Sequence, residues 1–289
     1  MRSAFLVRVA VACASIALCA LLSKPPPRAS ARVTLELLPN PLVIKLLGHS
    51  QQDFIADLFW IRMANMAGNA ATVDECASLI PIGNLIADLA PRFKYPYYLG
   101  GVMAPFRHYK RGGLSTYDNV EGAHALMSRG VKDVPDYVRL FVQKAYTELE
   151  MMKDPAMAGE TLKLASQIPD APPFLPRLAT RLLASAGQFD EAREFAESMA
   201  TSDNPQLKAD FELRLRQIEL EKVLVAVETA AKSFADAQGS RATRVEQLVQ
   251  AGFLPQLPVD PFGGEIELTE TGARSSVESR RLQLHVAPE

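Results

Sequence analysis

Two stretches of the chain repeat at an offset of 34 residues. Ala158 precedes Ala192 by this interval, and Leu149 precedes Leu183 by the same interval. Other apolar and small residues align in the same way: Ala145 with Ala179, Leu162 with Ala196, and Ala165 with Met199. A period of this length is typical of helix–turn–helix units that stack on one another. The repeat therefore predicts a mainly α-helical chain of stacked helical hairpins, whose function is binding rather than catalysis.

The two aligned units, residues 136–205, resemble tetratricopeptide repeats. In that family, small residues at two positions let the paired helices approach closely. Ala158 and Ala192 match the first position, and Ala165 matches the second, where Met199 departs from the pattern. The turn glycine of the family is matched by Gly187, whereas Lys153 stands at the equivalent place in the first unit.

The resemblance is weaker upstream, where residues 51–134 look like degenerate repeats. It implies a helical-hairpin solenoid over residues 33–205, with a concave face formed by the first helix of each pair. The concave positions in the two clear units are Leu140, Gln143, Thr147, Glu150, Phe174, Arg177, Arg181 and Ala184.

Two of these concave positions, Arg177 and Arg181, lie one helical turn apart. Guanidinium groups bind carboxylates through paired hydrogen bonds, so the resemblance predicts a partner protein with an acidic or carboxylate-bearing extended segment. The alternative is that both arginines pair with acidic residues on a neighbouring helix.

Apolar periodicity predicts the positions of the helices. They are expected at Gln51–Gly68, Val73–Ala90 with a kink at Pro81, Phe93–Tyr109, Asp118–Gly130, Asp136–Met151, Pro155–Gln167, Pro173–Ala186, Phe189–Met199, Leu207–Ala237 and Val245–Ala251. Lys110–Thr116 is expected to be an inserted loop.

The pattern changes near the C-terminus, where 265–268 and 281–286 alternate with period two and predict an antiparallel hairpin. Residues 206–289 are thus expected to form a long helix, a short helix and a β-hairpin cap.

A short motif in this C-terminal part, Asp260-Pro261-Phe262-Gly263, is similar to a segment in the tails of type II secretion pseudopilins. This likeness implies an alternative function as a subunit or assembly factor of a secretion, pilus-like or other membrane complex. Such a subunit would bury aromatic residues at interfaces; the candidates are Trp60, Tyr97, Tyr98 and Phe106. The chain lacks the Gly-Phe-Thr-x-x-Glu processing site of pilins, so it is not identified as a pilin.

The N-terminal residues have the pattern of an export signal, since Arg2 and Arg8 precede an uncharged apolar run over Val9–Leu22. Ala29-Ser30-Ala31 offers a cleavage site, whereas Ala4–Leu22 approaches the ~20 residues that span a bilayer. Residues 1–32 are therefore expected to be a signal peptide or an N-terminal membrane anchor with a linker. A buried cytosolic helix is the third interpretation. Export would place the chain in the periplasm, or anchor it in the inner membrane facing the periplasm.

Charge and motifs argue against several other functions. The net charge of −2 gives no basic excess for binding nucleic acid. The histidines have no metal-ligand spacing, and neither a phosphate-binding loop nor a Gly-x-Ser-x-Gly motif is present. The carboxylates of Asp260, Glu265, Glu267 and Glu270 could hold calcium, but the EF-hand alternation is missing, which favours solvated hairpin charges instead.

The sequence thus predicts a non-catalytic protein–protein interaction scaffold of the bacterial cell envelope, with no cofactor and no metal. A small-ligand binder or an enzyme in the degenerate N-terminal half is the second alternative.

Overall fold

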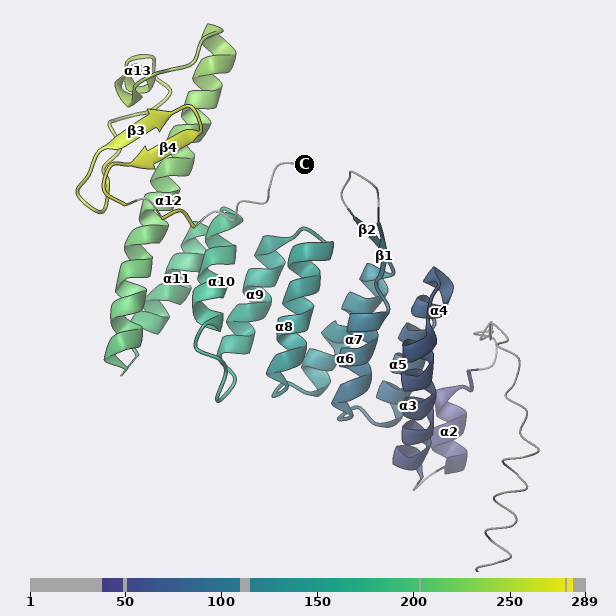
Figure 1. Cartoon of the computed structure of the whole chain (residues 1–289). Helices are drawn as coiled ribbons and strands as arrows, with labels where there is room; N and C mark the ends of the chain where they lie inside the picture. The colour runs from purple at the N-terminus through teal and green to yellow at the C-terminus, as the bar shows by residue number, and fades with distance from the viewer. Residues whose placement is uncertain (1–37, 49–50, 110–114, 203, 279, 283–289) are drawn as a thin grey trace, which may run out of the picture. The chain divides into compact units, whose positions relative to one another are not determined.

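The computed structural model describes residues 38–48, 51–109, 115–202, 204–278 and 280–282. The expected signal peptide or anchor, residues 1–32, lies outside them. From Leu38 onward the chain forms one compact unit, which is mainly helical (Figure 1). Within the described residues, the strands form two small antiparallel hairpins. The predicted fold class is confirmed to this extent: a mainly α-helical chain with a long late helix and a small β-hairpin near the C-terminus.

The helices follow one another along the chain with short connections. They are α2 (Pro41–Gly48), α3 (Gln52–Asn69), α4 (Val73–Ala77), α5 (Leu79–Leu89), α6 (Lys94–Met103), α7 (Val120–Asp133), α8 (Val138–Tyr146), a π-helical turn η2 (Thr147–Met151), α9 (Pro155–Ser166), α10 (Leu175–Ser185), α11 (Phe189–Ala200), α12 (Pro205–Gln238) and α13 (Val245–Gln250). The strands are β1 (Phe106–His108), β2 (Thr116–Asp118), β3 (Ile266–Thr269) and β4 (Gly272–Ser275).

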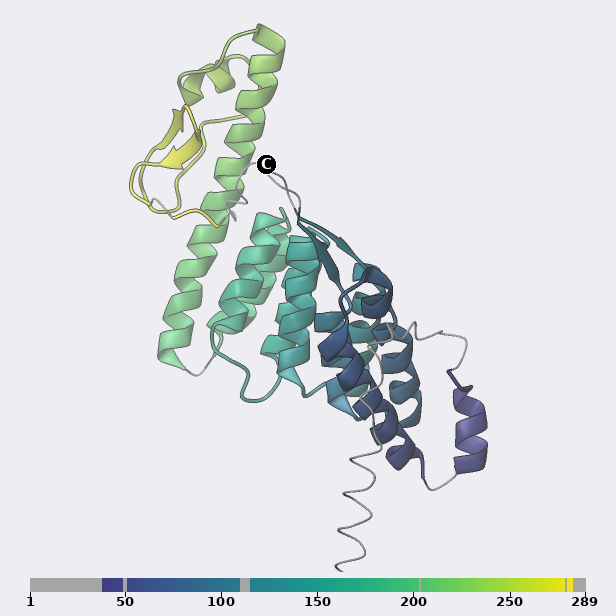
Figure 2. The same ribbon diagram turned by 45° about the vertical axis from the view of Figure 1, so that its right-hand side comes forward.

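The helices of the two repeat units pack in chain order. Helix α8 contacts α9, α9 contacts α10, α10 contacts α11, and α11 contacts α12. Figures 1 and 2 both show these helices side by side. The predicted boundary at 205/206 coincides with the start of α12, which nevertheless belongs to the same compact unit.

Small residues lie where these helices meet. Ala158 and Ala192, the two aligned alanines, are both fully buried. At Gly159 a Cβ atom would lie 2.8 Å from Cγ of Leu183 and 3.1 Å from its backbone nitrogen. Helix α9 can therefore approach α10 this closely only because a glycine faces that backbone.

The two units turn at the same aligned position. Gly187, between α10 and α11, has φ of +78°, and Lys153, 34 residues earlier and between η2 and α9, has φ of +59°. The backbone NH of Gln188 donates to the carbonyl of Leu183 at 3.0 Å, as in a left-handed helix C-cap. Both units thus reverse direction through one left-handed residue, although only the second unit has the glycine that favours it.

Two predicted helices differ from the structure near prolines. The helix expected at Val73–Ala90 is two helices, α4 and α5, which meet at Ser78. Pro81 does not kink a longer helix there, because it lies in the first turn of α5, where a missing NH is tolerated.

The helix expected at Phe93–Tyr109 is wrong in its second half. Helix α6 ends at Met103 with Ala104 as its C-cap, still in helical conformation. Pro105 follows and cannot continue the helix, because it has no NH to donate to a carbonyl one turn earlier. Strand β1 follows and pairs with β2, with Arg107 opposite Tyr117. The β1–β2 hairpin rises beyond the ends of the neighbouring helices in Figure 1.

The C-terminal hairpin forms, but its second strand is not the predicted one. Strand β3 pairs with β4 through the tight connection between Thr269 and Gly272, and β4 packs on α12. Residues 281–282, expected in the second strand, contact α12 instead. The pseudopilin-like motif has a structural role here: the Asp260 carboxylate accepts hydrogen bonds from Ser275 Oγ at 2.5 Å and from the NH of Phe262 at 2.8 Å.

The shared left-handed turn predicts opposite effects at its two aligned positions. Replacing Lys153→Gly should raise the free energy of unfolding by roughly 0.5–1 kcal/mol. A non-glycine residue costs about 1–2 kcal/mol in this conformation. Glycine removes that strain, but it loses more conformational entropy on folding, which offsets part of the gain. Replacing Gly187→Lys should lower it by about 1–2 kcal/mol. Denaturant titration of both variants measures the changes. Equal or reversed signs would contradict an equivalent turn in the two units.

Candidate partner-binding surface

Three of the predicted concave residues are buried and so cannot contact a partner in this structure. Leu140 packs in the core with Tyr97, Thr147 donates its hydroxyl hydrogen to the carbonyl of Gln143 at 3.2 Å, and Ala184 packs near Ala192. The tetratricopeptide register assumes a straight α-helix at this point, whereas α8 ends at Tyr146 and continues as the π-helical turn. That change in helical period helps to explain why Thr147 faces inward.

The other five predicted residues retain exposed surface. Gln143 is half-buried and Glu150 is exposed on η2. Phe174 stands at the N-terminal end of α10 with 54% of its surface exposed, and Arg177 follows it on the next turn. Arg181 is half-buried one further turn along.

Both predicted arginines have partners within the chain. Arg177 forms an ion pair with Asp210 of α12, as the alternative interpretation of the sequence expects. Arg181 forms no ion pair with an acid in the part of the chain that the structure describes, and its Nε donates to the backbone carbonyl of Leu282 at 3.3 Å. The C-terminal segment thus lies against the turn of α10 that carries the second arginine.

A third arginine, which the sequence did not indicate, completes a cluster. Arg214 of α12 is half-buried, and burial together with the positive charges of Arg181 and Arg177 lowers the pKa of its guanidinium. Asp210 opposes this shift, and it is the one carboxylate among the causes. We call Arg177, Arg181 and Arg214 the arginine cluster; among the described residues, Asp210 is the carboxylate that acts on the Arg214 guanidinium.

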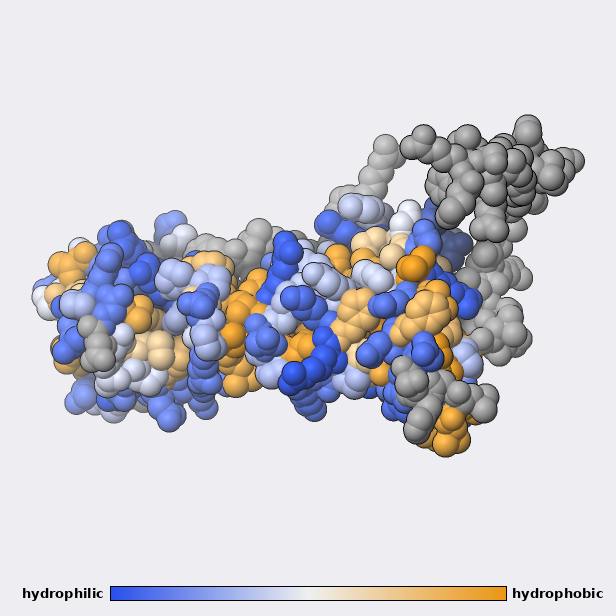
Figure 3. Space-filling view, turned by 90° about the horizontal axis from the view of Figure 1, so that it is seen from below, coloured by the Kyte–Doolittle hydropathy of each residue, from blue (hydrophilic) through white to orange (hydrophobic). Residues whose placement is uncertain are grey.

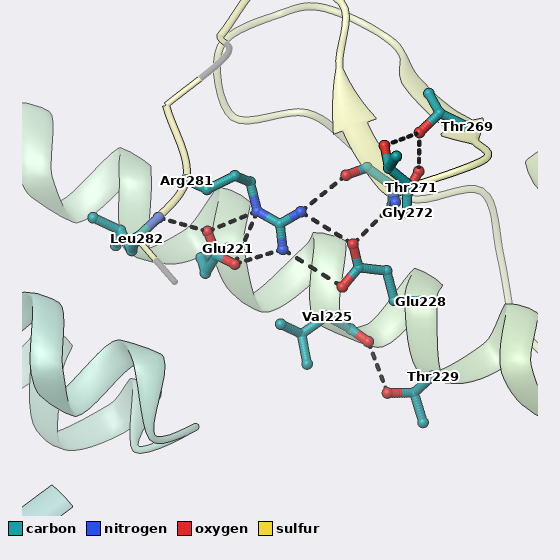
Figure 4. A network of polar contacts seen from close by, with 10 residues as sticks. Glu221, Val225, Glu228, Thr229, Thr269, Thr271, Gly272, Arg281 and Leu282 are labelled. Atoms are coloured by element: carbon teal, nitrogen blue, oxygen red, sulfur yellow. Dashed lines mark hydrogen bonds and ion pairs between the residues drawn. The ribbon is translucent and has the colours of Figure 1, made fainter. Parts of the chain in front are cut away.

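The segment at Leu282 is held by a buried salt-bridge network (Figure 4). The guanidinium of Arg281 bonds Glu221 at 2.7 Å and Glu228 at 3.0 Å, both on α12, and donates to the carbonyl of Ala273 at 3.0 Å. Glu221, only 1% exposed, also accepts the NH of Leu282 at 2.8 Å. Burial alone would lower the pKa of the Arg281 guanidinium, but its bonds to the two carboxylates outweigh burial and raise this pKa. The network holds the backbone of residues 281–282 against α12, where the Leu282 carbonyl meets Arg181.

Aromatic and cationic side chains also gather where α6 meets α8. The Tyr98 and Tyr137 rings pack edge to face with centroids 6.3 Å apart. Lys94 lies 4.9 Å from the Tyr137 centroid, and Arg139 lies 5.6 Å from the Tyr98 centroid. Tyrosine and arginine are enriched among residues that dominate binding energy at interfaces. The sequence identified only Tyr98 of this group as an interface candidate.

The other aromatic interface candidates lie mainly inside the fold. Tyr97 is fully buried, and its hydroxyl donates to Asp133 at 2.6 Å; burial and this carboxylate raise its pKa. Trp60 is half-buried against Phe93, with centroids 5.5 Å apart. Phe106 is half-buried beside His108 on β1.

A buried polar cluster ties α7, η2 and α9 together. The carboxylate of Glu148 is fully buried; it bonds His124 Nε2 at 2.8 Å and pairs with Lys144, which also donates to Thr161 at 3.0 Å. Since each of these side chains bonds another within the fold, the cluster acts here as a link between helices. One oxygen, Glu148 Oε2, has no hydrogen-bond partner within the described chain.

The carboxylates considered for calcium do not converge. Asp260 is buried against Ser275, and Glu267 pairs with Arg274 at 2.7 Å. Across the described part of the chain, no three His, Cys, Asp or Glu side chains gather as metal ligands would.

Comparisons with protein-family models, curated proteins and solved structures give no match to this chain. Among the described helices, none combines the length and apolar composition needed to cross a membrane.

The network at Arg281 can be tested against an exposed pair of the same type. Replacing Arg281→Met leaves the buried Glu221 carboxylate without its cation and should lower the free energy of unfolding by about 3–5 kcal/mol. The control Arg274→Met removes the exposed pair with Glu267 and should cost less than about 1 kcal/mol. Urea titration gives both values, and similar small losses would mean that Arg281 does not hold the C-terminal segment.

Proposed function

We propose that this chain is a non-catalytic protein–protein interaction scaffold of the bacterial cell envelope. It binds an acidic or carboxylate-bearing segment of a partner protein at the surface around α10 and α12. The observation that carries the proposal is the arginine cluster: Arg177 pairs with Asp210, Arg181 bonds only a backbone carbonyl among the described residues, and both lie near enough to Arg214 to lower its pKa. A carboxylate from a partner would relieve the repulsion between these arginines.

Recognition suits the groups at this surface better than catalysis does. Arginine stays protonated under ordinary conditions, so it serves as a hydrogen-bond donor rather than as a general acid or base. Phe174 supplies an exposed aromatic ring one turn from Arg177, and this pairing of apolar and cationic side chains is common at binding hot spots. The aromatic and cationic group on α6 and α8 offers a second contact area of similar chemistry.

The repeat architecture of the proposal is tetratricopeptide-like. Burial of the aligned alanines and the left-handed turns 34 residues apart support it. In such an array, the first helix of each pair supplies the binding face. Helices α8 and α10 are first helices in this register, and the exposed predicted residues on α10 border the arginine cluster.

Tethering to the inner membrane is part of the same proposal, and its support comes from the sequence. The apolar run Val9–Leu22, preceded by Arg2 and Arg8, would export the chain and hold it in the membrane or release it after cleavage. The partner is then expected in the periplasm or in a membrane complex that faces it.

Crosslinking from Phe174 tests the proposed surface directly. A photoreactive phenylalanine analogue at this position in the full-length chain should crosslink a partner protein in the source cell, with the products separated after solubilising the membranes. The matched control carries the analogue at Leu164 of α9, which has the same 54% exposure but lies outside the arginine cluster. Equal crosslinking from both positions would contradict a specific surface at α10.

A charge variant tests the contribution of the arginine cluster. Arg177→Glu in the chain with the analogue at Phe174 should reduce the crosslinked product roughly tenfold, because it replaces attraction for the partner carboxylate with repulsion. Arg193→Glu, a similarly exposed arginine on α11, is the control and should leave the yield unchanged. An unchanged yield for Arg177→Glu would overturn the acidic-partner proposal, whereas equal losses would indicate a non-specific effect of charge.

A further inference from the structure

The outward face of helix α3 carries large apolar side chains that nothing in the described structure covers. Phe54, Leu58 and Ile61 are 59%, 51% and 56% exposed. The opposite face of the same helix is buried in the core through Ala56, Met63 and Ala67. A helix that is apolar on both faces is typical of one buried on both sides. Figure 3 shows hydrophobic residues at the α2 and α3 end of the molecule.

The spacing on this face is that of a two-helix coiled coil. Phe54, Leu58, Ile61 and the exposed Asn65 follow one another in steps of four, three and four. This places Phe54 and Ile61 at the d positions of a heptad, and Leu58 and Asn65 at the a positions. An asparagine at a single a position is a known device for setting the register and number of helices.

Opposite charges flank the apolar seam. In the same register, Asp57 occupies the g position of one heptad and Arg62 the e position of the next, and both are exposed. Their separation of five residues does not match the three- or four-residue spacing of ion pairs within one helix. Among the described residues, neither forms an ion pair within 4.0 Å. In a parallel coiled coil, however, a g residue faces the e residue five positions later on the other helix.

We propose that this face binds a second copy of the same chain, with α3 pairing in parallel with its counterpart around a two-fold axis. The four heptad residues form the seam, and Asp57 of each copy pairs with Arg62 of the other. A two-fold interface is self-complementary, so one favourable g–e pair in the chain occurs twice in the dimer. The dimer does not depend on the arginine cluster, since none of those residues lies on α3.

Helix α2 also exposes apolar side chains. It packs against α3 and exposes Leu42, Val43 and Leu46. An 18-residue helix pair is short, and a stable interface buries about 1,200–2,000 Å² in total, so additional contacts from α2 would be required. A parallel pair directs the N-terminal ends of both α3 helices to the same side.

A lipid surface suits this face less well. Helices that lie on membranes carry lysine and arginine around their apolar side. Here Asp53 and Asp57 lie on the same helix, with Arg62 as its one basic residue. The negative charges of Asp53 and Asp57 beside the seam favour a protein partner that carries positive charge at the facing positions.

Charge reversal distinguishes the dimer from other occupants. We would measure the dimer dissociation constant of the full-length chain in detergent by sedimentation velocity. Asp57→Arg and Arg62→Asp should each weaken the dimer roughly tenfold, because each single change places like charges together twice. The double variant Asp57→Arg/Arg62→Asp should restore the dimer, since each pair is then re-formed with reversed signs. A monomeric wild-type chain, or a double variant as weak as the single ones, would overturn the proposal.

Disulfide formation tests the register independently of charge. In a chain with Cys13, Cys19 and Cys76 replaced by alanine, Ile61→Cys should oxidise rapidly to a dimer, because equivalent d positions face each other across a parallel seam. Leu164→Cys, of matching exposure on α9, should not. Similar rates for both would contradict the seam.

The same Ile61→Cys variant separates a dimer from a lipid-binding face. A fluorophore attached to its introduced thiol should report an apolar environment when the chain dimerises in detergent, and the charge variants should weaken that signal. If the fluorophore instead reports an apolar environment only in phosphatidylcholine–phosphatidylglycerol vesicles, and responds equally in the charge variants, the face binds lipid and the dimer is wrong.

Discussion

The close approach of neighbouring helices is the constraint on which the rest of the structure depends. Ala158, Ala192 and Gly159 lie where α9, α10 and α11 meet, and a larger side chain at Gly159 would collide with the backbone of α10. The small residues therefore set how closely α9 packs on α10, and the exposed side chains of the proposed surface, Phe174 and Arg177, lie at the N-terminal end of α10 and on its first turn.

Periodicity predicted the helices well where each repeat unit forms a local hairpin, because the spacing of apolar residues and the turn are contained in the same short stretch. It failed where local signals compete. Phe93–Tyr109 continues an apolar pattern, yet Pro105 ends α6 and the next residues form β1, which pairs with β2. The terminal hairpin failed in a similar way: two segments alternate with period two, but the tight turn at Gly272 joins β3 to the nearer strand.

The candidate surface shows a different limit of the sequence. A repeat register gives the direction of a side chain only while the helix keeps a constant period, so the π-helical turn after Tyr146 shifts the residues that follow it. Arg177 and Arg181 were identified because they lie one turn apart on one helix. Arg214 could not be found in this way, since it comes from α12 and meets them only through tertiary packing.

The Arg281 network links the stability of the C-terminal part to the geometry of the arginine cluster. Glu221 of α12 accepts a hydrogen bond from the NH of Leu282, and Arg181 of α10 donates one to the carbonyl of the same residue. Both helices therefore bind the same backbone segment. Arg181 is thereby fixed, whereas Arg177 pairs only with a partly exposed aspartate that water can screen. The two arginines therefore differ: Arg181 is held at a backbone carbonyl, whereas Arg177 is the guanidinium for which the proposed partner would compete with Asp210.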